Sequence, residues 1–86
     1  MYSVNFSSHA LDNISKLDKT VSGRILNKVE WLSTHFDAII PQPLKGKFHG
    51  IYKLIVGDWR VLYTFSTVDR TITIHLVGHR KDIYKS

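Results

Sequence analysis

Cysteine is absent from this sequence of 86 residues. Without thiols the chain has neither a disulfide framework nor a thiolate zinc site, and a small secreted domain usually depends on one of them. The chain does not start with a basic segment followed by an apolar run, and it contains no apolar run long enough to cross a bilayer. We therefore expect neither a signal peptide nor a membrane span, and we expect a cytoplasmic protein.

Carboxylates are scarce in the C-terminal part of the chain. From residue 38 onward only Asp58, Asp69 and Asp82 are acidic, whereas acidic and basic residues balance before that point. The basic residues of this part are Lys45, Lys47, Lys53, Arg60, Arg70, Arg80, Lys81 and Lys85. This part therefore carries the whole net charge of +5, which favours a polyanionic partner, with a solvated basic surface as the alternative. Because magnesium sites need clustered carboxylates, we expect no metal and no other cofactor.

The first half of the chain has the periodicity of one strand and two helices. The length fits a single domain over residues 1–86. Residues 2–6 alternate apolar and polar side chains, as a half-buried strand does. Ser8 is the expected N-cap of a first helix, and a second helix is expected over residues 20–36. Apolar residues at helical spacing are Leu11, Ile14 and Leu17 in the first helix and Val21, Ile25, Val29, Leu32 and Phe36 in the second.

The second half predicts an antiparallel meander. Pro41 and Pro43 indicate a linker, and Gly57-Asp58 is a two-residue hairpin turn with glycine first. This turn predicts that Val56 pairs with Trp59 and that the pairing continues to Tyr52 with Tyr63. A third strand over residues 71–77 would set Ile72, Ile74 and Leu76 opposite Phe65, Tyr63 and Val61. The predicted fold is α+β: an N-terminal strand, a helical hairpin, then an antiparallel β-meander with a short C-terminal tail.

The face of the meander that is turned away from the helices is expected to display cations. Strand alternation puts Lys53, Arg60 and His75 there, and Arg80 and Lys81 follow the third strand. A solvated strand face is the common explanation of such residues. Phosphate binding is favoured here because no carboxylate alternates with them. RNA can be cleaved without a metal when its 2′-hydroxyl attacks the phosphate and cations stabilise the transition state.

Three blocks of the second half follow one another in a specific order: PLKG at 43–46, GIYKLIVGDWRVLY at 50–63 and GHRKDIY at 78–84. In this order they resemble the RelE/ParE superfamily of bacterial toxins, and the expected strand, helical hairpin and meander agree with that family's fold. The resemblance implies the toxin of a toxin-antitoxin pair. In the RelE branch it further implies an endoribonuclease (mRNA interferase) that inhibits translation.

The resemblance also implies roles for four catalytic residues. Lys53 would bind and activate the RNA, Arg60 and Arg80 would stabilise the scissile phosphate, and Tyr84 would stack on or orient a base. Relatives often carry a second basic residue two positions after the lysine, where this chain has Ile55.

The departure at Ile55 bears on proton transfer. A neighbouring cation favours the neutral form of a lysine, so a lone Lys53 is less ready to accept a proton. The proton acceptor therefore stays open between Lys53 and His79.

The resemblance further implies several partners. Related toxins cut messenger RNA in the ribosomal decoding site, and an antitoxin protein silences them, in some cases while the complex binds operator DNA. Residues expected to contact RNA are Lys45, Lys47, His79, Lys81 and Lys85. Two alternatives remain: a ParE-type toxin, which blocks DNA gyrase without cutting RNA, and a nucleic-acid-binding subunit that acts only with its partner on operator DNA.

Overall fold

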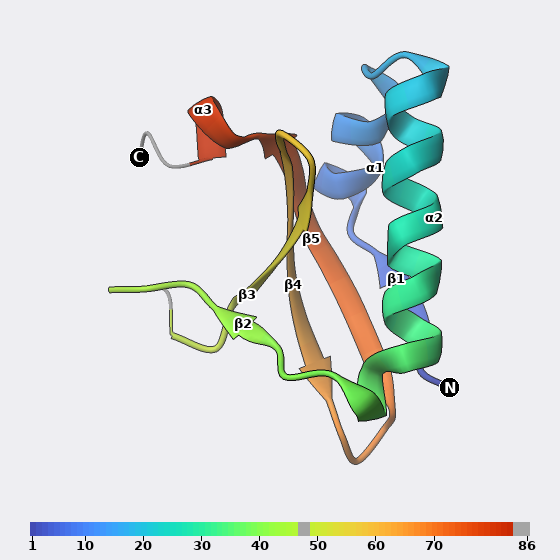
Figure 1. The fold of residues 1–86 in the computed structure, drawn as a ribbon, viewed down its shortest axis with the longest axis vertical. Helices are drawn as coiled ribbons and strands as arrows, with labels where there is room; N and C mark the ends of the chain where they lie inside the picture. Colours follow the sequence, from blue (N-terminus) through green and yellow to red (C-terminus); the bar gives the residue numbers. More distant parts are fainter. Residues whose placement is uncertain (47–48, 84–86) are drawn as a thin grey trace.

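The chain folds into a five-stranded sheet with a helical hairpin on one face (Figure 1). The computed structural model describes residues 1–46 and 49–83. In chain order the elements are β1 Ser3–Phe6, α1 Ser8–Ser15, α2 Lys19–His35, the 3₁₀ turn η1 Phe36–Ala38, β2 Gln42–Pro43, β3 Tyr52–Val56, β4 Trp59–Ser66, β5 Thr71–His79 and α3 Arg80–Ile83. The strand order is β1-β5-β4-β3-β2. The predicted α+β fold is confirmed.

Helix α2 forms as its apolar spacing predicts. Asp18 caps it, because its Oδ1 accepts a hydrogen bond from the Val21 N–H at 2.9 Å. Ile25, Val29 and Leu32 are buried on the sheet-facing side. The helix ends one residue earlier than expected, since Phe36 begins η1. Its side chain is still buried and packs edge-on against Phe65, with ring centroids 4.8 Å apart.

Helix α1 starts one residue earlier than the sequence suggested. Ser7, not Ser8, is the N-cap, and its Oγ accepts a hydrogen bond from the Ala10 N–H at 3.0 Å. Ala10 is fully buried, whereas Leu11, expected on the apolar side, is 55% exposed. Ile14 and Leu17 pack against the core as predicted. The small alanine keeps helical spacing with Ile14, so the periodicity alone could not separate positions 10 and 11.

The β3–β4 hairpin has the predicted register. Val56 pairs with Trp59, Ile55 with Arg60 and Tyr52 with Tyr63. Gly57 has a φ of +59°, which a two-residue turn with glycine first requires. The hairpin therefore orients its side chains as strand alternation predicts.

The predicted pairing of β5 fails near its end. Ile72 and Ile74 lie opposite Phe65 and Tyr63 as predicted, but a register shift then places Leu76 opposite Leu62. Val77, not Leu76, pairs with Val61 and is buried with it. The extra residue is His75. An additional residue in one strand reverses its alternation, which is why strict alternation misplaced Leu76.

Two strand pairings were not predicted. β1 runs parallel to β5, with Val4 beside Ile72. The expected proline linker contains the short strand β2, which pairs with β3 through Gln42 and Lys53. Pro43 is tolerated there because an edge strand does not need every backbone N–H for pairing.

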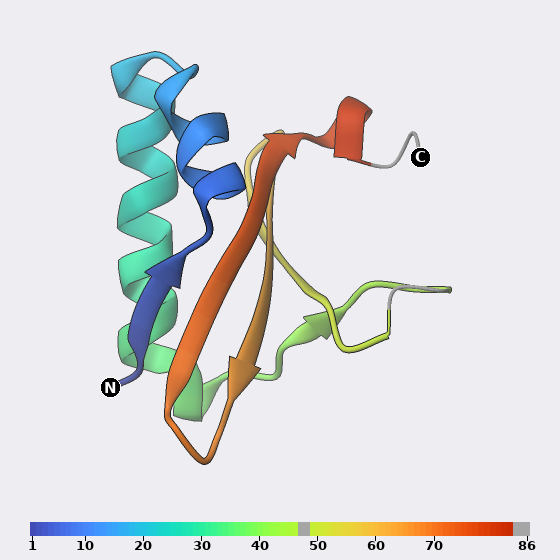
Figure 2. The ribbon, with the colours of Figure 1, turned by 180° about the vertical axis from the view of Figure 1, so that it is seen from behind.

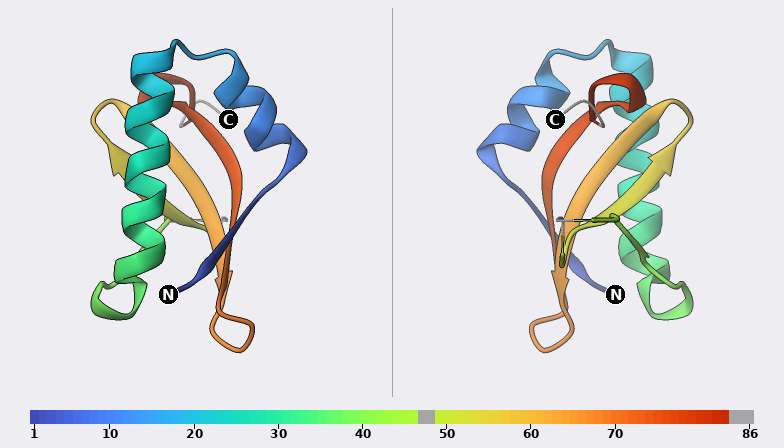
Figure 3. Two further views of the ribbon diagram at one scale, coloured as in Figure 1. Left: turned by 90° about the vertical axis from the view of Figure 1, so that its right-hand side faces the viewer. Right: turned by 90° about the vertical axis from the view of Figure 1, so that its left-hand side faces the viewer.

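The two faces of the sheet have different surroundings. Figure 3 shows α2 running along the sheet and α1 beside β5. Figure 2, seen from behind, shows α3 and the segment around β2 extending on the side away from these helices. The helix-facing side holds the core, whose most completely buried large side chains are Tyr63, Ile25, Leu32, Ile72, Ile74 and Val61. The opposite side, here called the outer face, lacks such a cover over the described residues.

Candidate nucleic-acid interface

Lys53 and Arg60 lie on the outer face, on neighbouring strands. Lys53 pairs with Leu62, and Arg60 pairs with Ile55 on one side and Gly78 on the other. The two cations are therefore diagonal neighbours, a separation of about 7 to 8 Å between their backbones that long side chains can span. Both residues are half-buried. The register confirms the predicted shared face of Lys53 and Arg60.

The β3–β4 turn contacts both arginines of the predicted site. The Arg60 Nη1 donates to the carbonyl oxygens of Gly57 at 2.9 Å and Trp59 at 3.0 Å. The Arg80 backbone N–H donates to the Asp58 carbonyl at 2.8 Å, and its Nε lies 3.5 Å from the Asp58 Oδ1. Folding thus brings Arg60 and Arg80, twenty positions apart, to one end of the sheet.

A close contact seats α3 on the end of β5. A Cβ added to Gly78 would lie 3.1 Å from the Ile83 Cδ1 and 3.3 Å from its Cγ1. Glycine at this position therefore lets Ile83 pack over the strand, directly beside the Gly78–Arg60 pair. This contact determines where α3, which begins at Arg80, lies on the end of the sheet.

His79 takes a different direction from Lys53 and Arg60. It pairs with Trp59, whose other partner Val56 is buried in the core, so alternation places His79 on the helix-facing side. Its ring lies edge-on to the Trp59 ring at 5.4 Å, and its Nδ1 accepts a hydrogen bond from the Lys81 N–H at 3.2 Å. Of the two candidate proton acceptors, Lys53 lies on the outer face with Arg60 and His79 does not, which favours Lys53.

Comparison with known proteins identifies the family. Residues 4–84 match the family model described as the ParE toxin of the type II toxin-antitoxin system parDE. The chain belongs to the ParE toxin family. Comparison with curated protein sequences gives no significant match.

Solved structures of toxins share the fold of this ParE-family chain. The RelBE2 toxin-antitoxin complex of Mycobacterium tuberculosis matches with 25% identity and a TM-score of 0.82, covering 92% of this chain and 98% of that one. The isolated RelE toxin of E. coli matches with 23% identity and a TM-score of 0.76, covering 98% and 92%. The archaeal RelE of the RelE-RelB complex from Pyrococcus horikoshii matches with 22% identity and a TM-score of 0.73, covering 94% and 97%. The predicted resemblance to the RelE/ParE superfamily is confirmed.

The remaining predicted site residues of the ParE-family chain fall into two groups. Lys45 and Lys81 are exposed, near the β2–β3 segment and on α3 respectively. Tyr84, Lys47 and Lys85 lie outside the described residues. Within residues 1–46 and 49–83 no three His, Cys, Asp or Glu side chains cluster as a metal site would require. In the same ranges no helix has the length and apolar character needed to cross a membrane.

Sequence reasoning missed two polar features near the candidate site. Asp58 was assigned only to the turn, although its carboxylate faces Arg80. The exposed His75 has its Nε2 2.8 Å from the Thr64 Oγ1. Neither contact has a sequence signal. The first joins the β3–β4 turn to α3, and the second joins β4 to β5 at the bulge, so both depend on how distant segments pair.

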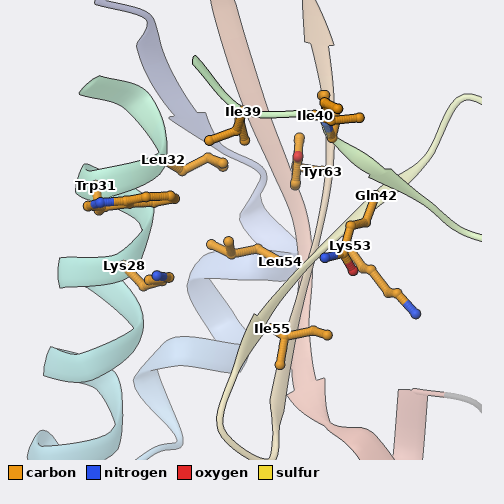
Figure 4. Close-up of a pocket in the computed structure, with 11 residues that line it drawn as sticks. Lys28, Trp31, Leu32, Ile39, Ile40, Gln42, Lys53, Leu54, Ile55 and Tyr63 are labelled. Carbon is orange, nitrogen blue, oxygen red and sulfur yellow. The ribbon is translucent and has the colours of Figure 1, made fainter. Parts of the chain in front are cut away.

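A separate hollow of about 270 Å³ lies between α2 and β3 (Figure 4). It is lined largely by apolar side chains, among them Trp31 and Ile39. Lys53 borders it, but in Figure 4 its amine points away from Trp31. Burial raises the pKa of Tyr63, another lining residue, to about 12. The Tyr63 phenol is therefore neutral at ordinary pH and does not serve as a proton acceptor.

Proposed function

We propose that this ParE-family protein is a toxin that cuts messenger RNA on the ribosome without a metal and thereby inhibits translation. The observation that carries the proposal is the grouping of cations on the outer face. Arg60 and Arg80 are held at one turn, and Lys53 is a diagonal neighbour of Arg60. Guanidinium groups bind phosphate oxygens through two parallel hydrogen bonds, which suits the crowded phosphate of a cleavage transition state.

The chemistry follows from these groups. The 2′-hydroxyl of the RNA attacks the adjacent phosphate and loses its proton to Lys53, while the bond from phosphorus to the 5′-oxygen breaks and the 5′-oxygen takes up a proton from water. Arg60 and Arg80 stabilise the charge that develops on the phosphate. Tyr84 would orient a neighbouring base, as the family resemblance implies. The products are a 2′,3′-cyclic phosphate and a 5′-hydroxyl, and DNA is not a substrate because it lacks the attacking group.

The proposal includes several macromolecular partners. The ribosome would position the message, and the exposed Lys45 and Lys81, with Lys47 and Lys85, would contact ribosomal RNA. An antitoxin protein would silence the toxin, since the M. tuberculosis and P. horikoshii relatives were solved in toxin-antitoxin complexes. That complex would also bind operator DNA. All of these partners are cytoplasmic.

A ParE-type toxin that blocks DNA gyrase is the second candidate. The match of residues 4–84 to the ParE toxin model favours it. In that case the outer-face cations would not touch RNA. The apolar hollow beside α2, with Trp31 38% exposed and Ile40 90% exposed, would be a surface for protein contact.

One experiment separates the two candidates. The purified protein is added to a translating extract, and new 5′ ends on the message are mapped. Cuts within codons at the decoding site support RNA cleavage. Intact message, together with inhibited supercoiling in a parallel gyrase assay, supports the ParE-type alternative.

A further inference from the structure

The turn between β3 and β4 contacts both Arg60 and Arg80. Gly57 and Asp58 of the turn and Trp59, the first residue of β4, offer carbonyl oxygens to Arg60 Nη1 and to the Arg80 backbone, and Asp58 adds a carboxylate beside Arg80 Nε. The described residues near the turn include no second acid paired with Arg80. Among the described residues, Asp58 is the acid that lies beside this guanidinium.

The Asp58–Arg80 pair contributes little to stability. Both side chains are mostly exposed, 66% for Asp58 and 55% for Arg80, and the N–O distance is long at 3.5 Å. Exposed ion pairs of this kind add little to the free energy of folding. Arg80 also belongs to a helix of only 4 residues, which cannot fix a long side chain by itself. What Asp58 provides is a negative charge beside one edge of the guanidinium.

The pairing through Nε leaves the terminal nitrogens of Arg80 available. An arginine has five N–H donors in a planar fork, and the Asp58 carboxylate lies 3.5 Å from Nε, at the edge of the guanidinium away from the Nη1/Nη2 end. A phosphate can therefore bind at this end while the carboxylate holds the opposite edge. The same turn also accepts hydrogen bonds from Arg60 through its carbonyl groups, so both arginines contact one short loop.

We propose that Asp58 is a positioning residue for RNA cleavage, which orients the Arg80 guanidinium toward the scissile phosphate. The inference rests on the proposed cleavage of RNA by this face. In this proposal Asp58 acts through Arg80 and not on the RNA itself.

A double-mutant cycle tests this inference. We compare the wild type, Asp58→Ala, Arg80→Ala and the double variant for kcat and KM of message cleavage on ribosomes, and for melting temperature. We expect Asp58→Ala to lower kcat about tenfold with little change in KM. The reason is that a misoriented guanidinium stabilises the transition state less well but changes ground-state binding little. In the Arg80→Ala background the same change should have no further effect. Asp58→Asn, which keeps an oxygen acceptor, should retain most of the activity.

Three outcomes would overturn the inference: additive losses in the double variant, a fall in melting temperature that accounts for the loss, or a higher kcat in Asp58→Ala. The last would mean that the carboxylate competes with the phosphate. A second measurement needs no activity. The Nε–H of Arg80, followed by NMR in the intact protein, should exchange with water more slowly in the wild type and Asp58→Asn than in Asp58→Ala. If the wild type cuts no RNA, the proposed function fails, and this signal still decides whether Asp58 holds Arg80.

Discussion

At the scale of single residues, the two arginines of the candidate site differ in how they are held. Arg60 is half-buried on a central strand, and its Nη1 is hydrogen-bonded to two backbone carbonyl groups. Arg80 is exposed on a short helix and pairs with a carboxylate. Arg60 is thus bonded to backbone carbonyl groups of the β3–β4 hairpin, whereas the Arg80 side chain lies beside a carboxylate.

We expect Arg60→Ala and Arg80→Ala each to fold and to lose most of the toxic activity. Loss of one contact to the developing phosphate charge costs about 3 kcal/mol, a rate factor of about a hundred. Growth arrest on induction and message cleavage in an extract measure the loss, and circular dichroism checks the fold. Lys19→Ala is the matched control, because Lys19 is an exposed cation at the start of α2, on the opposite side of the sheet. Full toxicity in both folded arginine variants would refute the assignment.

Ile55 offers a gain-of-function test. Its side chain is 43% exposed and lies opposite Arg60, on the same face as Lys53. Ile55→Lys would add a cation that attracts the phosphate and favours the neutral, proton-accepting form of Lys53. We expect faster cleavage and a pH optimum shifted downward, measured as a pH-rate profile beside the melting temperature. A stable variant with an unchanged profile would show that Lys53 is not the proton acceptor.

At the scale of elements, a polar clamp closes the end of the sheet away from the candidate site. Arg70, in the turn before β5, donates to Asp37 of η1 at 2.8 Å and 3.5 Å, and its guanidinium lies 4.6 Å from the centroid of the Tyr2 ring. Arg70 has a φ of +54°, a backbone conformation that residues other than glycine rarely adopt. Its interactions with Asp37 and Tyr2 help to keep this turn in place.

The clamp makes stability depend on pH in the acid range. Hydrogen bonds from Arg70, and its charge, hold the pKa of the Asp37 carboxyl below its ordinary value of 3.8. A lowered pKa in the folded state means that the contribution is complete above that value and is lost as pH falls through the lower folded pKa. We expect the wild type to melt above Asp37→Asn near neutral pH, and the difference to shrink below 3.8.

Melting temperatures from about pH 7 to about pH 2 check this expectation. Asp82→Asn is a suitable control, because Asp82 is an exposed carboxylate of α3 with no ion pair seen among the described residues. A difference between the wild type and Asp37→Asn that stays constant over the whole range would contradict the clamp.

At the scale of the whole molecule, the sheet separates the hydrophobic core from the outer face, which carries the candidate site. The helix-facing side buries Tyr63, Ile25 and Ile74. The outer face and its turn carry Lys53 and Arg60, and α3 extends on that side (Figure 2). The outer face can therefore change its surface residues at low cost to the core.

The scarcity of carboxylates from residue 38 onward leads to a test of the reaction class. We expect cleavage to survive a chelator once ribosomes hold only the magnesium they need for assembly. The products should end in a 2′,3′-cyclic phosphate and a 5′-hydroxyl, which end-labelling and mass spectrometry distinguish. A 5′-phosphate would point instead to attack by water in a metal-dependent reaction.

The sequence by itself determined the local architecture. The glycine-first turn set the β3–β4 register, because a two-residue loop leaves the flanking strands one way to pair. The spacing of Ile25, Val29 and Leu32 predicted the buried side of α2, because helical periodicity is a local property. The shared face of Lys53 and Arg60 followed from the same register.

Only the tertiary structure decided how distant segments meet. The parallel pairing of β1 with β5, the bulge at His75 and the burial of Val77 depend on contacts across the chain that leave no periodic signal. The bulge reverses alternation along β5 and so sets the side on which His79 lies. Asp58 meets Arg80 for a similar reason, since β5 must reach the hairpin turn before α3 can place the guanidinium there.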